Sequence, residues 1–296
     1  MIRYDCEPAG ISAQVAALDA KWEGKAEKET KALIKAGAFP AGSKTIWSLV
    51  KPAFMAIQHN KCIYCEKQLA NSTYGTIEWD LEHFRPKSTV ASWPDAARHA
   101  DLQYTFVTGD ASATGYYWLA YNLGNYAASC KVCNSTFKHI YFPVAGARGA
   151  VPAQPEALLA EEPFLCLPLG SSDEDPENLL RFVVTTAIPA ADNGPLRDRG
   201  QVIIDFFGLN KRDDLHRERA QMIGLLGNAL ANRADGHGRE VDEHIITRME
   251  GDNIPHANCV RSFRRLWETD EPLARRAHDL CLEFGFSEPG TAPPRL

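Results

Sequence analysis

Apolar residues recur at helical spacing through the first part of the chain. Two stretches show this pattern, Ile11 to Phe39 and Lys44 to Asn60. In the second stretch, four apolar residues lie three or four positions apart: Trp47, Val50, Phe54 and Ile57. Such spacing gathers apolar side chains on one face of a helix. It predicts two helices in residues 1–60 that pack against the central part of the protein and do no chemistry.

The pattern changes between Lys61 and Val144, where short aromatic and β-branched stretches alternate with turns. In residues 77–82, apolar and acidic side chains alternate, which predicts a half-buried strand that Pro86 ends. Glu82 and His83 therefore fall at the end of this strand. Neighbouring side chains of an ideal strand face opposite ways, so both can serve one site only if the chain curls there.

The C-terminal half begins with a stretch rich in Pro, Gly and acidic residues, 145–178, which predicts a long surface connection. Residues 179–189 predict a short pair of strands, and a turn follows at Asp192–Gly194. Helical spacing then appears in four stretches: 199–209, 213–234, 241–249 and 259–285. Residues 287–296 predict a frayed tail.

Composition limits the classes of protein that this chain can be. With 296 residues, 45% of them hydrophobic, the chain can bury a core, and it contains no run of about 18 apolar residues. The N-terminus has no signal-like apolar segment, so we expect a cytoplasmic protein that does not associate with membranes. The net charge of −6 argues against a generally basic surface. Any contact with nucleic acid must come from local clusters, a metal ion or a partner subunit.

Four of the eight cysteines form two CxxC pairs, Cys62/Cys65 and Cys130/Cys133. In a reducing compartment such pairs favour metal binding over disulfides, and two pairs complete a tetrahedral Zn²⁺ site of the closed, structural kind. Residues 66–129 separate the pairs, a longer interval than the usual 15 to about 20 residues. Redox or simply buried cysteines are the alternative. The other four stand alone and are expected to be small buried hydrophobes.

Polar residues around the second pair add to the pattern. By itself, a Glu-His pair on a strand is more typical of a solvated surface. Asn125 precedes the second pair, where its amide could tie the turn to the backbone of the Glu82-His83 strand. Asn134 follows Cys133 at the expected start of a helix, and Lys138 lies one turn later on the same face.

Taken in order, these residues resemble the HNH (ββα-metal, or His-Me finger) endonucleases of the four-cysteine type. The resemblance implies that His83 is the general base and that Asn125 orients the strand. It also implies that Glu82 and Asn134 bind a catalytic Mg²⁺ or Mn²⁺ ion, beside a structural Zn²⁺. Two departures stand out: Glu82 occupies a position where the family often has Asp or His, and the loop from the strand to Asn125 is much longer than usual.

Residues 61–220 more narrowly resemble the HNH proteins of bacterial anti-phage systems, the Septu nuclease subunit and its retron-associated relatives. The shared strings include YYWLAYNLGN, SCKVCNSTFK and GLNKRDDLHRER. This resemblance implies a DNA-cutting effector that works beside an ABC-type ATPase. The expected fold is α+β: a ββα-metal core with a four-cysteine zinc site in residues 61–145, after an N-terminal helical region in 1–60. A linker, a β-hairpin and a helical region are expected in 146–296.

Two questions stay open at this level. Five cations near the motif are candidates to clamp backbone phosphates, although each alone is more typical of a solvated surface: Arg85, Lys87, Lys131, Lys138 and His139. The basic residues of 211–219 have acidic neighbours, which favours an exposed helix face with ion pairs. The rival functions are a zinc-ribbon adaptor without catalysis and an HNH nuclease that cuts RNA, including tRNA.

Overall fold

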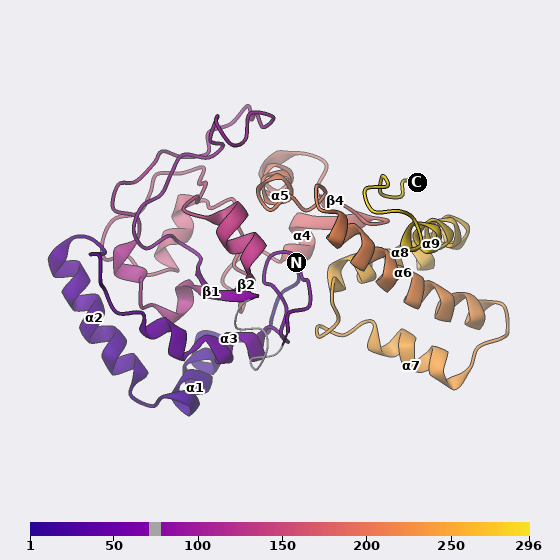
Figure 1. The fold of residues 1–296 in the computed structure, drawn as a ribbon, viewed down its shortest axis with the longest axis horizontal. Coiled ribbons are helices and arrows are strands. Elements are labelled where there is room, and N and C mark those ends of the chain that lie inside the picture. The colour runs from indigo at the N-terminus through magenta and orange to yellow at the C-terminus, as the bar shows by residue number, and fades with distance from the viewer. Residues whose placement is uncertain (71–77) are drawn as a thin grey trace. The chain divides into compact units, whose positions relative to one another are not determined.

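The computed structural model describes residues 1–70 and 78–296, so residue 77 of the predicted strand lies outside the described residues. The chain divides into two compact units (Figure 1). We call Arg3–Ile63 with Leu69–Glu174 the mixed unit, and Met1–Ile2, Tyr64–Gln68 and Asp175–Leu296 the helical unit. No helix within the described ranges is long and apolar enough to cross a bilayer.

The N-terminal helices of the mixed unit are shorter than their apolar spacing predicts. The first stretch forms two helices, α1 (Pro8–Leu18) and α2 (Trp22–Ala36), because the backbone is extended at Asp19, whose carboxylate accepts a hydrogen bond from the Lys21 amide. Gly37 ends α2 in the left-handed conformation that glycine adopts without strain.

The second stretch also divides, into a 3-10 turn, Ile46–Leu49, and α3, Lys51–Ile57. Pro52 lies in the first turn of α3, where its missing amide proton costs no helical hydrogen bond. The predicted period was therefore right for the apolar face, but the number of helices was wrong.

Two antiparallel strands and a following helix form the centre of the mixed unit. Strand β1 (Trp79–His83) pairs with β2 (Tyr126–Cys130), and His83 lies opposite Tyr126. A π-helix, Val132–Lys138, follows β2 almost directly and begins two residues before Asn134. Helix α3 packs on both strands (Figure 1).

The connection in 145–178 is less exposed than its composition predicts. A 3-10 helix, Ala157–Glu161, buries Leu158 and Glu161, and Leu165 is fully buried. Backbone bridges join Val144 to Pro163 and Tyr4 to Leu169. The apolar residues of this stretch are spaced irregularly, so they do not form one periodic element. Several of them are nevertheless buried, and the stretch forms part of the core of the mixed unit.

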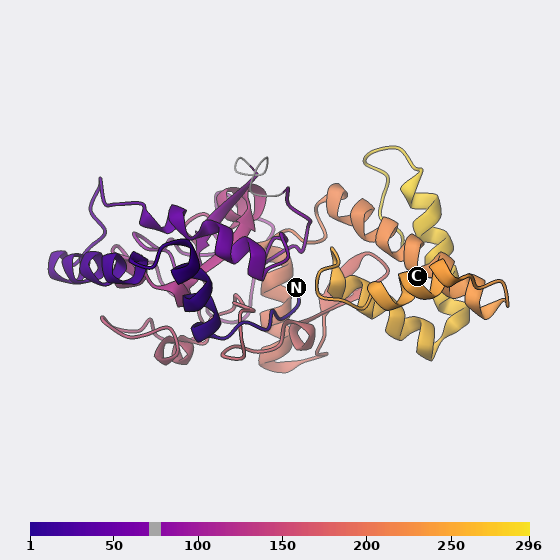
Figure 2. The same cartoon turned by 90° about the horizontal axis from the view of Figure 1, so that it is seen from below.

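The helical unit contains the predicted strand pair, β3 (Leu180–Val183) with β4 (Thr186–Pro189). Its helices follow in chain order: α4 (Pro176–Leu179), α5 (Gly194–Phe206), α6 (Asp213–Ala234), α7 (Glu240–Arg248), α8 (Ala257–Thr269) and α9 (Glu271–Gly285). Helix α6 packs on α7, α8 and α9 around an apolar core (Figure 2). The single helix predicted over 259–285 breaks at Asp270, whose side chain caps α9 by accepting from the Leu273 amide.

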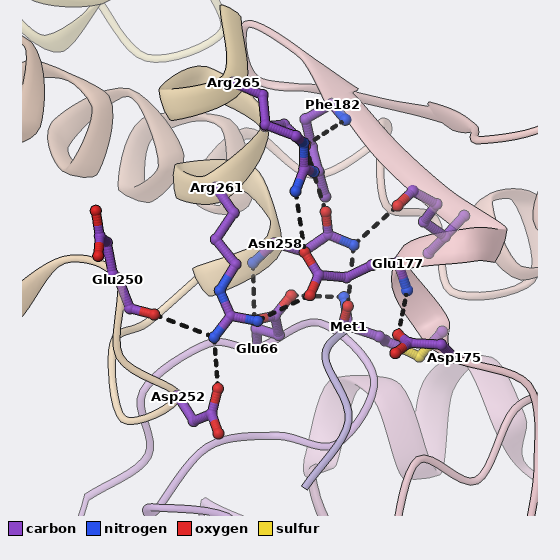
Figure 3. Close-up of polar contacts among 12 residues, drawn as sticks. Met1, Glu66, Asp175, Glu177, Phe182, Glu250, Asp252, Asn258, Arg261 and Arg265 are labelled. Atoms are coloured by element: carbon purple, nitrogen blue, oxygen red, sulfur yellow. Dashed lines mark hydrogen bonds and ion pairs between the residues drawn. The ribbon is translucent and has the colours of Figure 1, made fainter. Parts of the chain in front are cut away.

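A polar cluster at the start of α8 holds three separate segments of the helical unit together (Figure 3). The ammonium group of Met1 lies 2.5 Å from Glu66, and both are buried. The Asn258 amide donates to the carbonyls of Met1 and Leu180, at 3.0 and 2.9 Å. Arg261 pairs with Glu177 at 2.8 Å. These contacts explain why residues near 1 and 66 belong with α8.

Candidate active site

The four paired cysteines come together as their spacing predicts. The sulfur atoms of Cys62, Cys65, Cys130 and Cys133 lie within 4.8 Å of one another, and all four residues are buried. Four Zn–S bonds of about 2.3 Å place sulfur atoms about 3.8 Å apart, so the cluster fits a tetrahedral zinc ion. All eight cysteines lie within the described residues, and none forms a disulfide.

Glu82, His83 and Asn134 line one cavity of about 290 Å³ in the mixed unit. Two come from the end of β1 and the third from the π-helix after Cys133. Adjacent residues of a regular strand face opposite sides, yet Glu82 and His83 both line this cavity while β1 stays paired with β2 through His83.

The imidazole of His83 is held on three sides. The rings of Trp47 and Tyr126 meet it edge to face, with centroids at 4.8 and 5.1 Å. Its Nε2 lies 3.0 Å from the carbonyl oxygen of Ala120, which can only accept, so Nε2 carries the proton and Nδ1 has the lone pair. Burial, aided by the charge of Lys87, holds the pKa of His83 well below 6.5, so the ring is neutral at physiological pH.

Glu82 is a buried carboxylate with a buried cation beside it. The Lys138 ammonium lies 2.5 Å from Glu82 Oε1 and donates to the carbonyl of His83 at 3.0 Å. Burial raises the pKa of Glu82, and Lys138 opposes this. Because a lone buried charge is costly, Lys138 stabilises the ionised form of Glu82.

Asp80 also lines the cavity, and motif reasoning did not select it. Its carboxylate accepts from the Asn134 amide at 3.2 Å and pairs with Lys131 at 3.1 Å. Asp80 is two residues before Glu82, and alternate strand residues share a face, so the two-residue period was the signal that could have found it.

Asn125 lies outside the cavity wall and holds the backbone behind it. Its side-chain oxygen accepts from the Arg85 amide at 2.7 Å, and its nitrogen donates to the carbonyls of Arg85 and Leu119 at 3.0 and 3.3 Å. The side chain is fully buried. The Asn125 side chain thus binds the backbone of the segment that follows His83, close to the strand end where the sequence predicted such a contact.

The N-terminal region contributes to the cavity, which its apolar spacing did not indicate. Trp47, Ser48 and Lys51 form part of the wall. Lys87, also on the wall, lies with its ammonium 5.1 Å from the Trp47 ring centroid. The expectation that residues 1–60 only pack against the centre is therefore corrected: they close one side of the site.

Comparison with known proteins gives a partial match. The Septu protein PtuB of Bacillus mycoides (strain KBAB4) is 29% identical to the chain over 179 residues, which cover 60% of this chain and 51% of the relative. The chain therefore spans about half the length of this curated relative. No protein-family model matches the chain, and no solved structure matches it.

The five expected phosphate clamps fall into different environments. Lys87 and His139 line the cavity, and Lys131 is exposed beside Asp80. Arg85 is buried: it pairs with Glu161 at 3.2 Å and donates to the carbonyl of Leu158. The role expected for Arg85 is thus corrected, because a guanidinium in the core offers no charge to a bound phosphate. Lys138 is likewise buried, against Glu82.

The donor sets of the two sites differ in kind. Four thiolates suit zinc and leave it no open coordination position. The cavity instead offers the oxygen atoms of Asp80, Glu82 and Asn134, the hard ligands that Mg²⁺ and Mn²⁺ favour. The residues present therefore fit one structural and one hydrated divalent ion.

Proposed function

We propose that this protein is a metal-dependent HNH endonuclease that hydrolyses phosphodiester bonds in DNA. One observation carries the proposal: a carboxylate and a neutral imidazole at the end of β1 line the same cavity as a carboxamide of the π-helix. The order strand, antiparallel strand, helix beside a four-cysteine cluster supports a ββα-metal core. A zinc-ribbon adaptor would have no need for this convergence.

His83 is the proposed general base. Its Nε2 proton is committed to the Ala120 carbonyl, so Nδ1 accepts the proton of the attacking water. The rings of Trp47 and Tyr126 hold the imidazole in this orientation. A pKa below the usual value keeps the base unprotonated at neutral pH.

Glu82 and Asn134 are the proposed ligands of a Mg²⁺ or Mn²⁺ ion, and Asp80 orients the Asn134 amide. When bound there, such an ion would supply positive charge to the phosphate and to the departing 3′ oxygen. Lys138 belongs to the same group, because its ammonium keeps Glu82 ionised before an ion binds. The products expected from this family resemblance are 3′-hydroxyl and 5′-phosphate ends.

We further infer a role in bacterial anti-phage defence, beside an ABC-type ATPase. The similarity to a Septu protein supports this part of the proposal. A partner that recognises nucleic acid is consistent with the chain's net charge of −6, which provides no general attraction to DNA. RNA, including tRNA, is the second candidate substrate, since the same groups hydrolyse either backbone.

The test is a Mg²⁺-dependent nicking assay on supercoiled plasmid, with RNA in parallel. It uses the isolated chain and the chain mixed with the proposed ABC-type ATPase partner. The His83→Ala variant lacks the proposed general base, so it should cut about 10²- to 10⁴-fold more slowly. Its zinc content should stay unchanged. His244→Ala, an exposed histidine of α7, is the matched control and should cut normally. Cutting by His83→Ala at the normal rate would show that the base is another residue.

A further inference from the structure

A second cavity of the mixed unit is formed mainly by the long connection between β1 and β2. It has a volume of about 1060 Å³ and is lined by residues 92–112 and 145–148, with gaps. We call it the insertion cleft. Small-molecule sites typically occupy about 300–1,000 Å³, so the cleft has room for a ligand larger than one nucleotide base.

A row of tilted and stacked aromatic rings contributes to the wall of the insertion cleft. The ring centroids of Trp93 and Tyr104 are 5.4 Å apart at 31°, and those of Tyr104 and Phe106 are 5.0 Å apart at 32°. Phe164 stacks behind Phe106 at 5.3 Å and 22°. Tyr104 and Phe106 are half-buried, and both line the cleft.

Backbone hydrogen bonds hold this wall in place. Val90 and Ser112 exchange both backbone hydrogen bonds, at 2.8 and 2.9 Å, and the Val144 amide donates to the Thr108 carbonyl at 3.1 Å. The hydroxyl of Thr108 also donates to the carbonyl of Trp93. A wall held at several points loses little conformational entropy when a ligand binds.

The charges of the cleft point to a base and not to a phosphate. Arg148 and Asp110 are the oppositely charged residues on its wall. The guanidinium of Arg148 already donates to the carbonyls of Asp110 and Phe142 and to the hydroxyl of Tyr116, at 2.8, 3.0 and 3.0 Å. Burial lowers the pKa of His99, which leaves this lining imidazole neutral. A nearly neutral aromatic wall suits the face of a nucleobase.

The insertion cleft and the candidate active-site cavity are lined by neighbouring residues of the same segment. Ser88 and Ile140 line the active-site cavity, and the Ala91 amide donates to the Ile140 carbonyl at 3.1 Å. Ser92, the next residue along the chain, lines the cleft. A strand that follows residues 88–92 from the active-site cavity would be led toward Ser92 and Trp93 of the cleft.

We propose that the insertion cleft binds unpaired nucleotides of the substrate strand, with bases stacked on Tyr104 and Phe106 beside the active-site cavity. The inference rests on the proposed nuclease function and adds a preference to it: substrates with an unpaired segment near the scissile bond. In duplex DNA the bases stack on each other, so they offer no free face to these rings.

The test measures binding without cutting. The full chain carrying His83→Ala is titrated, without divalent metal, against a short single-stranded oligonucleotide and a blunt duplex, by fluorescence anisotropy. Adding Tyr104→Leu and Phe106→Leu keeps apolar bulk in the wall but removes the aromatic faces. Zinc content and the melting temperature establish that this variant is folded. Phe286→Ala, whose ring is 92% exposed in the helical unit, is the control.

We expect the two leucine substitutions to weaken single-strand binding about 5- to 150-fold and to leave duplex binding and the control unchanged. Because the cleft binds bases and not phosphates, the ratio of the single-strand affinities with and without the leucine substitutions should not change with salt concentration. An oligonucleotide with a photoreactive iodouracil should crosslink within residues 93–106. Excess free mononucleotide should compete weakly if the ligand is an unpaired strand, and strongly if the cleft is a mononucleotide site.

Equal single-strand affinity of the folded leucine variant, no single-strand binding, crosslinks only elsewhere, or strong mononucleotide competition would each overturn the proposal. Failure of the nuclease function itself gives a different result. In that case the chain with His83 intact would cut nothing, but the dependence of single-strand binding on Tyr104 and Phe106 would persist.

Discussion

Asn125 in the mixed unit and Asn258 in the helical unit are both fully buried, and each donates its amide to two backbone carbonyls. Their surroundings differ. The backbone that Asn125 holds continues from His83, which lines a cavity with Glu82. The backbone that Asn258 holds borders a core of apolar side chains. A buried polar group is thus no sign of a site by itself, and convergence of unlike polar groups on one cavity is the stronger sign.

Cysteines show a similar contrast, between a converging cluster and single buried residues. Cys133 and its three partners gather their sulfur atoms. Cys259 and Cys281 lie instead in the apolar core of the helical unit, where burial raises the pKa of the Cys259 thiol to about 12. A thiol of this kind stays protonated and is a poor metal ligand, since metals bind the thiolate.

The largest effect should come from removing a cysteine of the cluster. Structural zinc contributes about 10–16 kcal/mol of apparent folding free energy in small domains, so Cys133→Ala should lose zinc and strongly destabilise the fold around the cluster. Cys281→Ala should retain zinc and lose only about 1–2 kcal/mol of stability. Elemental analysis and thermal unfolding measure both. Full zinc content in Cys133→Ala would contradict the assignment of the site.

The next largest effect on stability is expected from the two buried arginines, Arg85 and Arg219, whose removal should cost different amounts of unfolding free energy. Arg85→Met leaves the Glu161 carboxylate buried without its cation, which costs about 3–5 kcal/mol of unfolding free energy. Arg219→Met leaves two unpaired carbonyls and should cost about 1–3 kcal/mol. Chemical denaturation gives both values. The Arg85→Met/Glu161→Gln double variant should recover much of the loss, and no recovery would show that the ion pair is not the cause.

Replacing Asn125 or Asn258 should distinguish an effect on stability from an effect on the rate of cutting. Asn125→Ala and Asn258→Ala each remove hydrogen bonds from buried carbonyls, so each should lose about 1–3 kcal/mol. Only Asn125→Ala should also slow cutting, by about 10- to 100-fold, because the segment after His83 loses its tie. Equal cutting rates of the two variants, measured well below their melting temperatures, would remove Asn125 from the site.

Exposed ion pairs should give the smallest effects. Lys131 pairs with Asp80, and Arg275 pairs with Asp235 and Glu271. Neither Lys131→Ala nor Arg275→Ala should change the unfolding free energy measurably, since water screens such pairs. If Lys131 contacts a phosphate, its removal should lower by about one the slope of the logarithm of nucleic-acid affinity against the logarithm of salt concentration. Arg275→Ala should leave that slope unchanged.

Local patterns in the sequence predicted much of the site. The two CxxC spacings indicated the cysteine cluster, and the alternation before Pro86 predicted strand β1. Helix breaks at Asp19 and Asp270 were missed, because apolar spacing reports which face is buried and not where a side chain caps the backbone.

What the sequence alone determined is the set of groups with repeating or fixed local spacing: paired thiols, an alternating strand and helices with one apolar face. Only the tertiary structure decided that Trp47 closes the cavity, that Asp80 contacts Asn134 and that Arg85 is buried against Glu161. Each of these joins residues far apart in the chain. Their approach depends on how whole elements pack, which no local period encodes.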